Sequence, residues 1–219
     1  MKYKTTLLLS LASISLFAQN NSDLISDLSS QTGRSLYIRP NITDPTVQKH
    51  YISTQFKRAY VSGYEGNDKF RYNGMTDNFE FLSNDEVLNL VKSPLLKVTF
   101  TGNAGIFYYI NYVNDKGVQR DRFVQAIIDE PSKYSLFKTF EVEEVVNDNI
   151  NGYKSVEDKR VRIERNFIIG FENQNQQISK STKKISQFLK INAEEIIKTN
   201  KLNLKKEEDV IKFIEILNK

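Results

Sequence analysis

Three residue types are scarce or missing in this chain of 219 residues, which contains no cysteine, no tryptophan and a single histidine, His50. Without cysteine the chain can form no disulfide bond and cannot carry a lipid anchor of the bacterial lipoprotein type. A single histidine excludes a zinc site built from several histidines. A Ser-His-Asp triad needs only one histidine and is therefore possible by count, but no G-x-S-x-G turn accompanies His50. We expect His50 to be exposed and inert.

Motifs that hold phosphates, metals or redox groups are absent as well: there is no glycine-rich phosphate loop, no H-E-x-x-H and no C-x-x-C. Residues 147–152 come nearest to a calcium loop but lack its ligand spacing, and they are better explained as a turn. Paired carboxylates that hydrolyse a glycoside would have to come from dispersed acidic clusters, namely Glu143-Glu144, Asp148, Glu157-Asp158 and Glu207-Glu208-Asp209. The sequence therefore predicts no cofactor and no metal, and it favours a non-enzymatic protein.

The N-terminus has the three parts of a secretory signal peptide in order. Lys2 and Lys4 make it positive, residues 5–17 are uncharged and mainly apolar, and the small Ala18 precedes a polar stretch that begins at Gln19. The apolar stretch is too short for a bilayer span, which needs about 20 residues. We therefore predict a signal peptide over residues 1–18, cleavage between Ala18 and Gln19, and a periplasmic, outer-membrane-associated or extracellular protein without a transmembrane span.

Composition and charge indicate a folded, strand-rich domain. Hydrophobic residues make up 39% of the chain, which is enough for a core, and the 14 Phe and 11 Tyr favour strands. The formal net charge is +4, and loss of Lys2 and Lys4 lowers it to +2. This small surplus gives little support for a nucleic-acid partner, and we expect none.

The best-determined local structure is a hairpin over residues 70–81. Two alternating segments flank a four-residue loop, Gly74–Asp77. That loop length predicts the cross-strand pairs Phe70 with Phe81, Arg71 with Glu80, and Tyr72 with Phe79. One face is then aromatic and the other carries a charge pair. We expect the aromatic face to be buried and the hairpin to be mainly structural.

A second hairpin is predicted where residues 106–113 turn at 114–117 and return through 118–128, with Gly117 at a left-handed position. Further strands are expected at 56–64, 95–101, 161–171 and 176–179. Residues 134–146 fit strand or helix, and their Phe, Thr, Tyr and Val content favours strand. Helices are expected after Asn192, which Glu195 follows at capping-box spacing, and over a terminal apolar stripe of Val210, Ile211, Ile214 and Leu217.

Together these patterns predict an α+β fold, in which an antiparallel sheet, as a sandwich or an open barrel, is packed against short C-terminal helices. The expected organisation is a polar N-terminal arm over residues 19–50, an antiparallel β domain over 51–180, and a helical segment over 181–219 that docks on it.

Two short blocks are similar to an uncharacterised group of secreted proteins from Bacteroidota-type bacteria. One is the hairpin that begins Phe70-Arg71-Tyr72-Asn73, an RYN motif, and the other is the lysine-rich tail KLNLKKEEDVIKFIEILN at residues 201–218. The signal peptide ending in Phe17-Ala18-Gln19 also resembles those of that lineage. The resemblance implies an exported protein with a strand-rich region followed by a helical tail, and it implies no activity.

The candidate binding residues are polar and aromatic side chains of the two hairpins: Arg71, Tyr72, Asn73, Asp77, Glu80, Tyr108, Tyr109 and Tyr112. Exposed tyrosines could line a sugar-binding or peptide-binding face, although packing into the core or under a helix is the favoured interpretation. We expect an exported, non-enzymatic cell-envelope protein that binds or scaffolds another envelope protein or polymer. The alternative is a carboxylate-dependent hydrolase of an envelope polymer or glycan.

Export with cleavage after Ala18 can be tested directly. N-terminal sequencing of the exported protein should start at Gln19 or within a residue or two of it, because the apolar stretch ends at that point. Recovery of intact Met1 from a membrane fraction would contradict the prediction.

Overall fold

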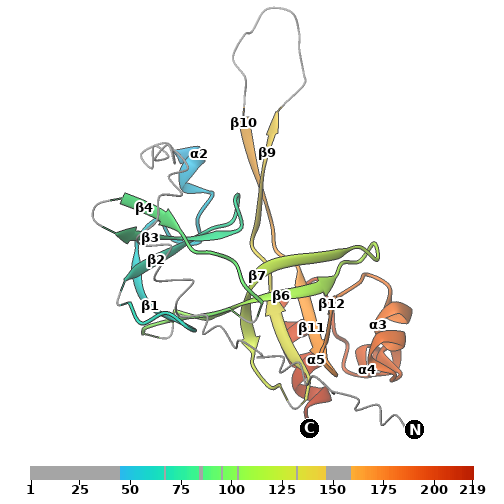
Figure 1. Ribbon diagram of the computed structural model, residues 1–219. Coiled ribbons are helices and arrows are strands. Elements are labelled where there is room, and N and C mark those ends of the chain that lie inside the picture. The colour runs from blue at the N-terminus through green and yellow to red at the C-terminus, as the bar shows by residue number, and fades with distance from the viewer. Residues whose placement is uncertain are drawn as a thin grey trace, which may run out of the picture. The chain divides into compact units, whose positions relative to one another are not determined.

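A computed structural model describes residues 45–66, 68–83, 86–94, 96–102, 104–131, 133–146 and 159–219 (Figure 1). The predicted signal peptide, the arm up to residue 44 and the turn at 147–152 lie outside these residues. The strands are β1 (Lys57–Val61), β2 (Lys69–Asn73), β3 (Asn78–Ser83), β4 (Glu86–Asn89), β5 (Lys97–Phe100), β6 (Ile106–Val113), β7 (Gln119–Ile128), β8 (Ser135–Lys138), β9 (Glu141–Val146), β10 (Lys159–Glu164), β11 (Phe167–Phe171) and β12 (Gln174–Gln177). The helices are α2 (Pro45–Gln48), α3 (Thr182–Leu189), α4 (Ala193–Thr199) and α5 (Glu207–Leu217). The predicted α+β class is confirmed.

Ten strands form one hydrogen-bonded sheet in the order β12-β11-β8-β7-β6-β5-β1-β2-β3-β4. β1 belongs to both halves of it, because Lys57 and Arg58 pair with β2 whereas residues 59–61 pair with β5. A single parallel bridge between Val113 and Gln176 joins β6 to β12. That bridge closes β6, β7, β8, β11 and β12 into a ring of five strands, and β1–β4 form a meander beside it.

The hairpin over residues 70–81 has the predicted register, with Phe70 opposite Phe81, Arg71 opposite Glu80 and Tyr72 opposite Phe79. Its aromatic face is buried: Phe70 and Phe79 are 0% exposed and Phe81 packs against the same cluster. The second predicted hairpin, β6–β7, is also present, and Gly117 has the left-handed φ of +82°.

Each of the two strands expected at 134–146 and 161–171 is interrupted. The first is divided into β8 and β9, and the second into β10 and β11. The pairs Lys138–Phe167 and Glu141–Glu164 nevertheless follow one antiparallel register, so Arg165 lies opposite Phe140 between them. The resulting β9–β10 hairpin projects from the ring in Figure 1. Residues 139–140 and 165–166 therefore form two adjacent connectors at the base of this hairpin.

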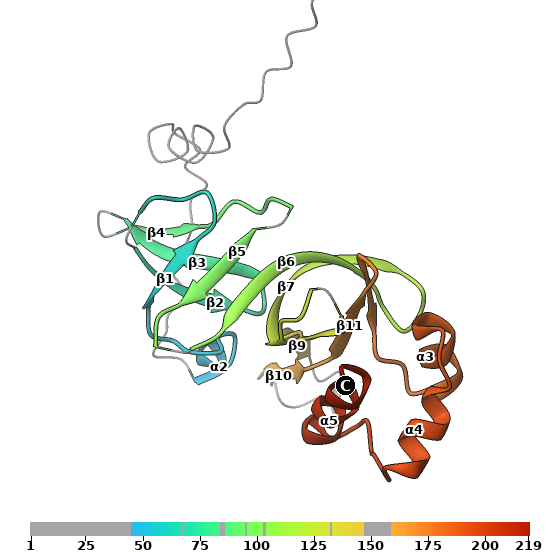
Figure 2. The same ribbon diagram turned by 90° about the horizontal axis from the view of Figure 1, so that it is seen from below.

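The C-terminal helices pack beside β11 and β12, as Figures 1 and 2 both show. In α5, Val210, Phe213 and Ile214 are each 0% exposed and join a cluster with Leu136 of β8 and Ile169 of β11. The predicted cap is present in α4, where Glu195 N donates to Asn192 Oδ1 at 3.3 Å. Within the described residues, no helix has the length and apolar character needed to cross a membrane.

Removal of α5 should destabilise the whole domain. Deleting residues 204–219 exposes the hydrophobic cluster that α5 forms with β8 and β11. Burial of each large aliphatic side chain in it contributes about 1.5 to 3 kcal/mol. The truncated protein should aggregate or become sensitive to protease, and Ile214→Asp should approach the same outcome because it places a charge in the core. Lys212→Asp, which introduces the same carboxylate on the exposed side of α5, is the matched control. An unchanged melting temperature for the truncated protein would mean that α5 is not part of the fold.

Candidate functional site

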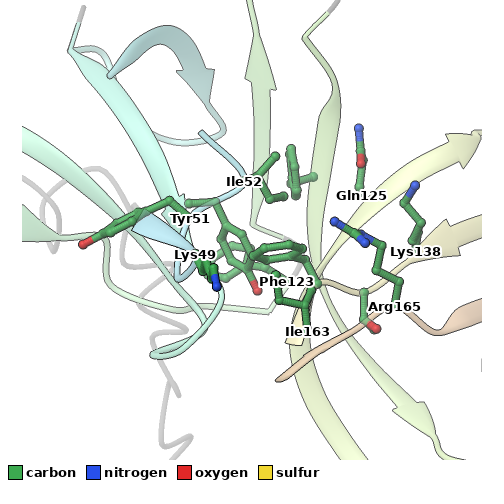
Figure 3. Close-up of a pocket in the computed structure, with 12 residues that line it drawn as sticks. Lys49, Tyr51, Ile52, Phe123, Gln125, Lys138, Ile163 and Arg165 are labelled. Carbon is green, nitrogen blue, oxygen red and sulfur yellow. The ribbon is translucent and has the colours of Figure 1, made fainter. Parts of the chain in front are cut away.

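The described residues surround a pocket of about 290 Å³ at the base of the β9–β10 hairpin (Figure 3). One side is the segment 49–52, which leads from α2 towards β1, and the other is formed by the two connectors. The lining contains five aromatic side chains, two aliphatic ones, two neutral polar ones and three cations: Tyr51, Tyr72, Phe107, Phe123, Phe140; Ile52, Ile163; Gln125, Thr139; Lys49, Lys138 and Arg165.

Packed rings form the floor of the pocket. The Tyr72 ring centroid lies 5.7 Å from that of Phe107, 6.3 Å from that of Phe123 and 6.4 Å from that of Phe140. All four side chains are buried. Such tilted and edge-on contacts hold aromatic rings in place, so the floor is preformed.

Asp77, at the end of the β2–β3 loop, holds this floor from behind. Its Oδ1 accepts a hydrogen bond from Tyr72 Oη at 2.7 Å and another from Phe123 N at 3.1 Å, while Oδ2 accepts one from Lys92 Nζ at 2.7 Å. The Phe123 amide is available because β8 pairs with β7 only from Gln125 onwards. Asp77 therefore replaces a missing strand partner and fixes two floor residues at once.

The surroundings of Asp77 keep the Tyr72 hydroxyl protonated and Arg122 positively charged. Burial, and then the negative charge of Asp77, raise the pKa of Tyr72 well above its usual value, so its hydroxyl remains a donor. Burial alone would lower the pKa of Arg122, but Asp77, Tyr72 and Glu141 outweigh it and raise that pKa. Arg122 Nε lies 3.6 Å from Asp77 Oδ1, beyond hydrogen-bond distance, so Coulomb attraction is the main interaction between them.

The wall opposite segment 49–52 is fixed by the two connectors. Thr139 N donates to Asn166 O at 2.8 Å, and Asn166 N donates back to Thr139 Oγ1 at 3.0 Å. These two hydrogen bonds fix the backbone beside Arg165, the residue before Asn166. The guanidinium carbon of Arg165 lies 5.5 Å from the centroid of the Phe140 ring. In Figure 3, Arg165, Lys138 and Gln125 lie on one side of the pocket and Lys49, Tyr51 and Ile52 on the other.

The lining is electropositive. Among the described residues it contains Lys49, Lys138 and Arg165 and neither Asp nor Glu. Lys138 Nζ is neutralised by Glu207 of α5, at 2.7 and 2.9 Å from its two carboxylate oxygens. For Lys49 and Arg165, no carboxylate among the described residues lies within ion-pair distance. The described lining thus combines an aromatic floor with two cations that have no carboxylate partner in this part of the chain.

A second network occupies the other face of the β2–β3 hairpin, where Arg71 and Glu80 form a buried ion pair. Arg71 Nε and Nη2 lie 2.7 and 2.6 Å from Glu80 Oε2, and the two side chains are 1% and 0% exposed. Asn73 Nδ2 and Tyr51 Oη donate to Glu80 Oε1 at 2.8 and 3.2 Å. The guanidinium also lies 4.3 Å from the ring centroids of both Tyr51 and Phe56. Segment 51–56 therefore covers the charged face, and both faces of the hairpin are buried.

The expectation that His50 is exposed is wrong, because His50 is only 8% exposed. Its carbonyl accepts a hydrogen bond from Gly74 N at 2.7 Å, which draws the residue against the β2–β3 loop. Its Nε2 lies 3.4 Å from Glu144 Oε1 of β9. The contact ties the segment that follows α2 to the β9–β10 hairpin.

The candidate tyrosines of β6 do not line the pocket. Tyr112 is buried, and burial, followed by the charge of Glu141, raises its pKa to about 12. Tyr108 and Tyr109 lie on opposite faces of β6: Tyr108 packs near Phe137 and donates to Asp129 Oδ2 at 2.7 Å, whereas Tyr109 packs on Phe123. These three side chains pack into or against the core.

Of the eight candidate residues, Tyr72 lines the pocket and Asp77 supports it, while Arg71, Asn73 and Glu80 belong to the buried ion-pair network. Sequence reasoning missed the cations Lys49, Lys138 and Arg165. The feature that marks two of them is the break in the expected strands, since Lys138 directly precedes it and Arg165 lies in it. Among the described residues, no group of three or more His, Asp or Glu side chains could hold a metal ion.

Comparisons with protein-family profiles, with curated proteins and with solved structures give no match.

The buried ion pair should be essential for stability. Glu80→Gln removes the charge that neutralises Arg71 in a site without solvent, and breaking such a pair costs about 3 to 5 kcal/mol. Glu143→Gln is the matched control, since Glu143 pairs with Arg162 at the surface, with both side chains more than half exposed. Chemical denaturation should show a large loss of unfolding free energy for the first variant and no measurable change for the second. Equal effects would contradict the assignment.

The Tyr72 hydroxyl should make stability depend on alkaline pH. Since its pKa is raised in the folded protein, the proton is held more tightly there than in the unfolded chain. Its contribution is fully present below about pH 10, the usual pKa of tyrosine, and is lost as the pH rises towards the folded value. Tyr72→Phe should therefore weaken the alkaline decrease of the unfolding free energy, measured by denaturation between about pH 8 and 11. An identical slope for both proteins would contradict the role given to this hydroxyl.

Proposed function

We propose that this chain is an exported, non-enzymatic cell-envelope protein that binds a group of another envelope protein or polymer in the pocket at the base of the β9–β10 hairpin. The observation that carries the proposal is the composition of that pocket. Buried rings form its floor, and its described lining includes three cations and no carboxylate. Aromatic surface and fixed charge are what a binding site needs to hold and orient a ligand.

Binding fits the positions of the acidic clusters better than hydrolysis. A glycosidase needs two carboxyl groups that face each other across a substrate site. Glu143 instead pairs with Arg162, Glu207 pairs with Lys138, and Asp209 Oδ2 accepts a hydrogen bond from Asn203 N at 2.9 Å. These three carboxylates are engaged in other contacts and do not face one another across the pocket, which makes a hydrolase the weaker candidate.

The envelope location in this proposal rests on the N-terminal pattern and on the resemblance to secreted proteins of Bacteroidota-type bacteria. The charged residues before residue 5, the short apolar stretch and Ala18 support export. An exported protein with a ligand pocket would meet its partner in the envelope or outside the cell.

Pocket binding can be tested with anilinonaphthalene sulfonate, a planar anion that fluoresces in apolar sites. We expect saturable binding at one site. Ile163→Trp should abolish it, because Ile163 lines the pocket, is 36% exposed and leaves room for the larger ring to fill the opening without disturbing the core. Leu82→Trp is the matched control, since Leu82 is 39% exposed and lies outside the lining.

Equal binding by both variants, with unchanged melting temperatures, would contradict the proposed pocket. Turnover of an envelope glycan by the purified protein would contradict the non-enzymatic assignment. Loss of that turnover on Glu143→Gln or Glu207→Gln would then identify the carboxylate responsible.

A further inference from the structure

We infer that the pocket takes a planar apolar group, of about the size of one amino-acid residue, that carries a carboxylate, and that Arg165 binds the carboxylate. This inference rests on the proposed function and specifies its ligand. The same chemistry occurs in a free aromatic acid and in the C-terminal aromatic residue of a partner polypeptide.

The size and the floor of the pocket determine the apolar part of the ligand. A volume of about 290 Å³ is at the lower end of the range for ligand pockets, so the site holds a single residue-sized group and not a stretch of polymer. The aromatic rings that line the pocket and the side chains of Ile52 and Ile163 offer apolar surface on several sides. A planar ring gains the most from such a site, because it can stack on or lie edge-on to Phe140 and Phe123.

Arg165 is positioned for an anion, and the described part of the chain supplies none. Its guanidinium stacks near Phe140, and no described residue offers it a carboxylate. The Thr139–Asn166 hydrogen bonds fix the backbone beside it, which limits the entropy lost when the side chain binds a ligand. A guanidinium presents a flat fork of N–H donors that matches the two oxygens of a carboxylate.

Neighbouring groups favour the same ligand charge. The side-chain amide of Gln125 lines the pocket and makes no hydrogen bond to another described residue, so it can donate to a ligand oxygen. From the opposite side Lys49 adds a second cation that no described carboxylate neutralises. Lys138 is already neutralised by Glu207, so its contribution is smaller. A cationic ligand would face these charges with no carboxylate in the described lining, and the site therefore selects against it.

Three phenylalanine derivatives of different charge separate the possibilities. At about pH 6, below the usual pKa of an α-amino group, N-acetylphenylalanine is anionic, N-acetylphenylalaninamide is neutral and phenylalaninamide is cationic. With the purified full chain, calorimetry should show binding of the anion about tenfold or more tighter than that of the neutral amide, and no binding of the cation. Arg165→Gln should reduce affinity for the anion to that of the amide and leave affinity for the amide unchanged. Arg120→Gln, which removes an exposed arginine of β7 outside the pocket, should change neither.

The outcomes distinguish this inference from the proposed function. Equal affinity for the anion and the amide would overturn the carboxylate preference while leaving a binding pocket. Binding of anilinonaphthalene sulfonate but of none of the three derivatives would overturn the ligand class alone. Failure of all four compounds to bind would overturn both.

A further binding experiment identifies the source of the ligand. A peptide that ends in phenylalanine with a free carboxylate, compared with N-acetylphenylalanine, tests whether the pocket accommodates the rest of a chain. Equal or tighter binding of the peptide supports the C-terminus of a partner polypeptide. Binding weaker by about tenfold or more supports a free aromatic acid.

Discussion

The carboxylate of Asp77 is the interaction on which the described part of the molecule most depends, because it joins the β1–β4 meander to the five-stranded ring. It lies at the tip of one hairpin, in the left-handed conformation with φ of +51°, and bonds to the backbone of β7 and to the hydroxyl of Tyr72. Without it, the Phe123 amide would be a buried donor with no strand partner, which is costly. The carboxylate therefore determines how the two halves of the sheet meet and where the pocket floor lies.

Gly74, at the start of the same loop, allows this close approach. A β-carbon at position 74 would lie 2.4 Å from Cδ1 of the Phe140 ring, a distance that forces either the ring or the loop to move. On one side of the loop Gly74 N donates a hydrogen bond to His50 O, and on the other side Gly74 O accepts one from Val142 N at 3.3 Å. The β2–β3 loop, the segment 49–52 and β9 are thus hydrogen-bonded together around Phe140, whose ring lies near the guanidinium of Arg165.

Sequence reasoning succeeded where local patterns agree and failed where distant segments meet. The register of the β2–β3 hairpin could be read because a four-residue loop and the alternation of aromatic residues point to the same pairing. The burial of Arg71 and Glu80 could not be predicted from the hairpin pattern, because the side chains that cover them, Tyr51 and Phe56, come from a different segment of the chain. Charged residues are rarely buried, so exposure of such a pair is the ordinary expectation.

The pocket could not be predicted from the sequence for a related reason. Its lining comes from the segment after α2, from β2, β6, β7, β8 and β10, and from the two connectors, and no motif joins them. The Phe140–Arg165 contact depends on a register that continues through a break in both strands, whereas an uninterrupted strand was expected in each case. In the terminal helix, by contrast, the predicted stripe lies on the docked face, because a helix that packs on a sheet buries one face of its own repeat. Val210 and Ile214 are fully buried there, Ile211 and Leu217 are partly buried, and Phe213 completes the buried face.

The central claim is that Asp77 holds the pocket floor in a shape that binds a ligand. Hydrogen exchange of Asp77→Ala, measured residue by residue with and without N-acetylphenylalanine, tests it most directly, and α5 serves as an internal reference for global stability. We predict that the Phe123 amide loses protection, that protection in α5 is retained, and that the ligand no longer protects the pocket residues. Full protection of Phe123 in the variant, together with unchanged ligand protection, would contradict the account.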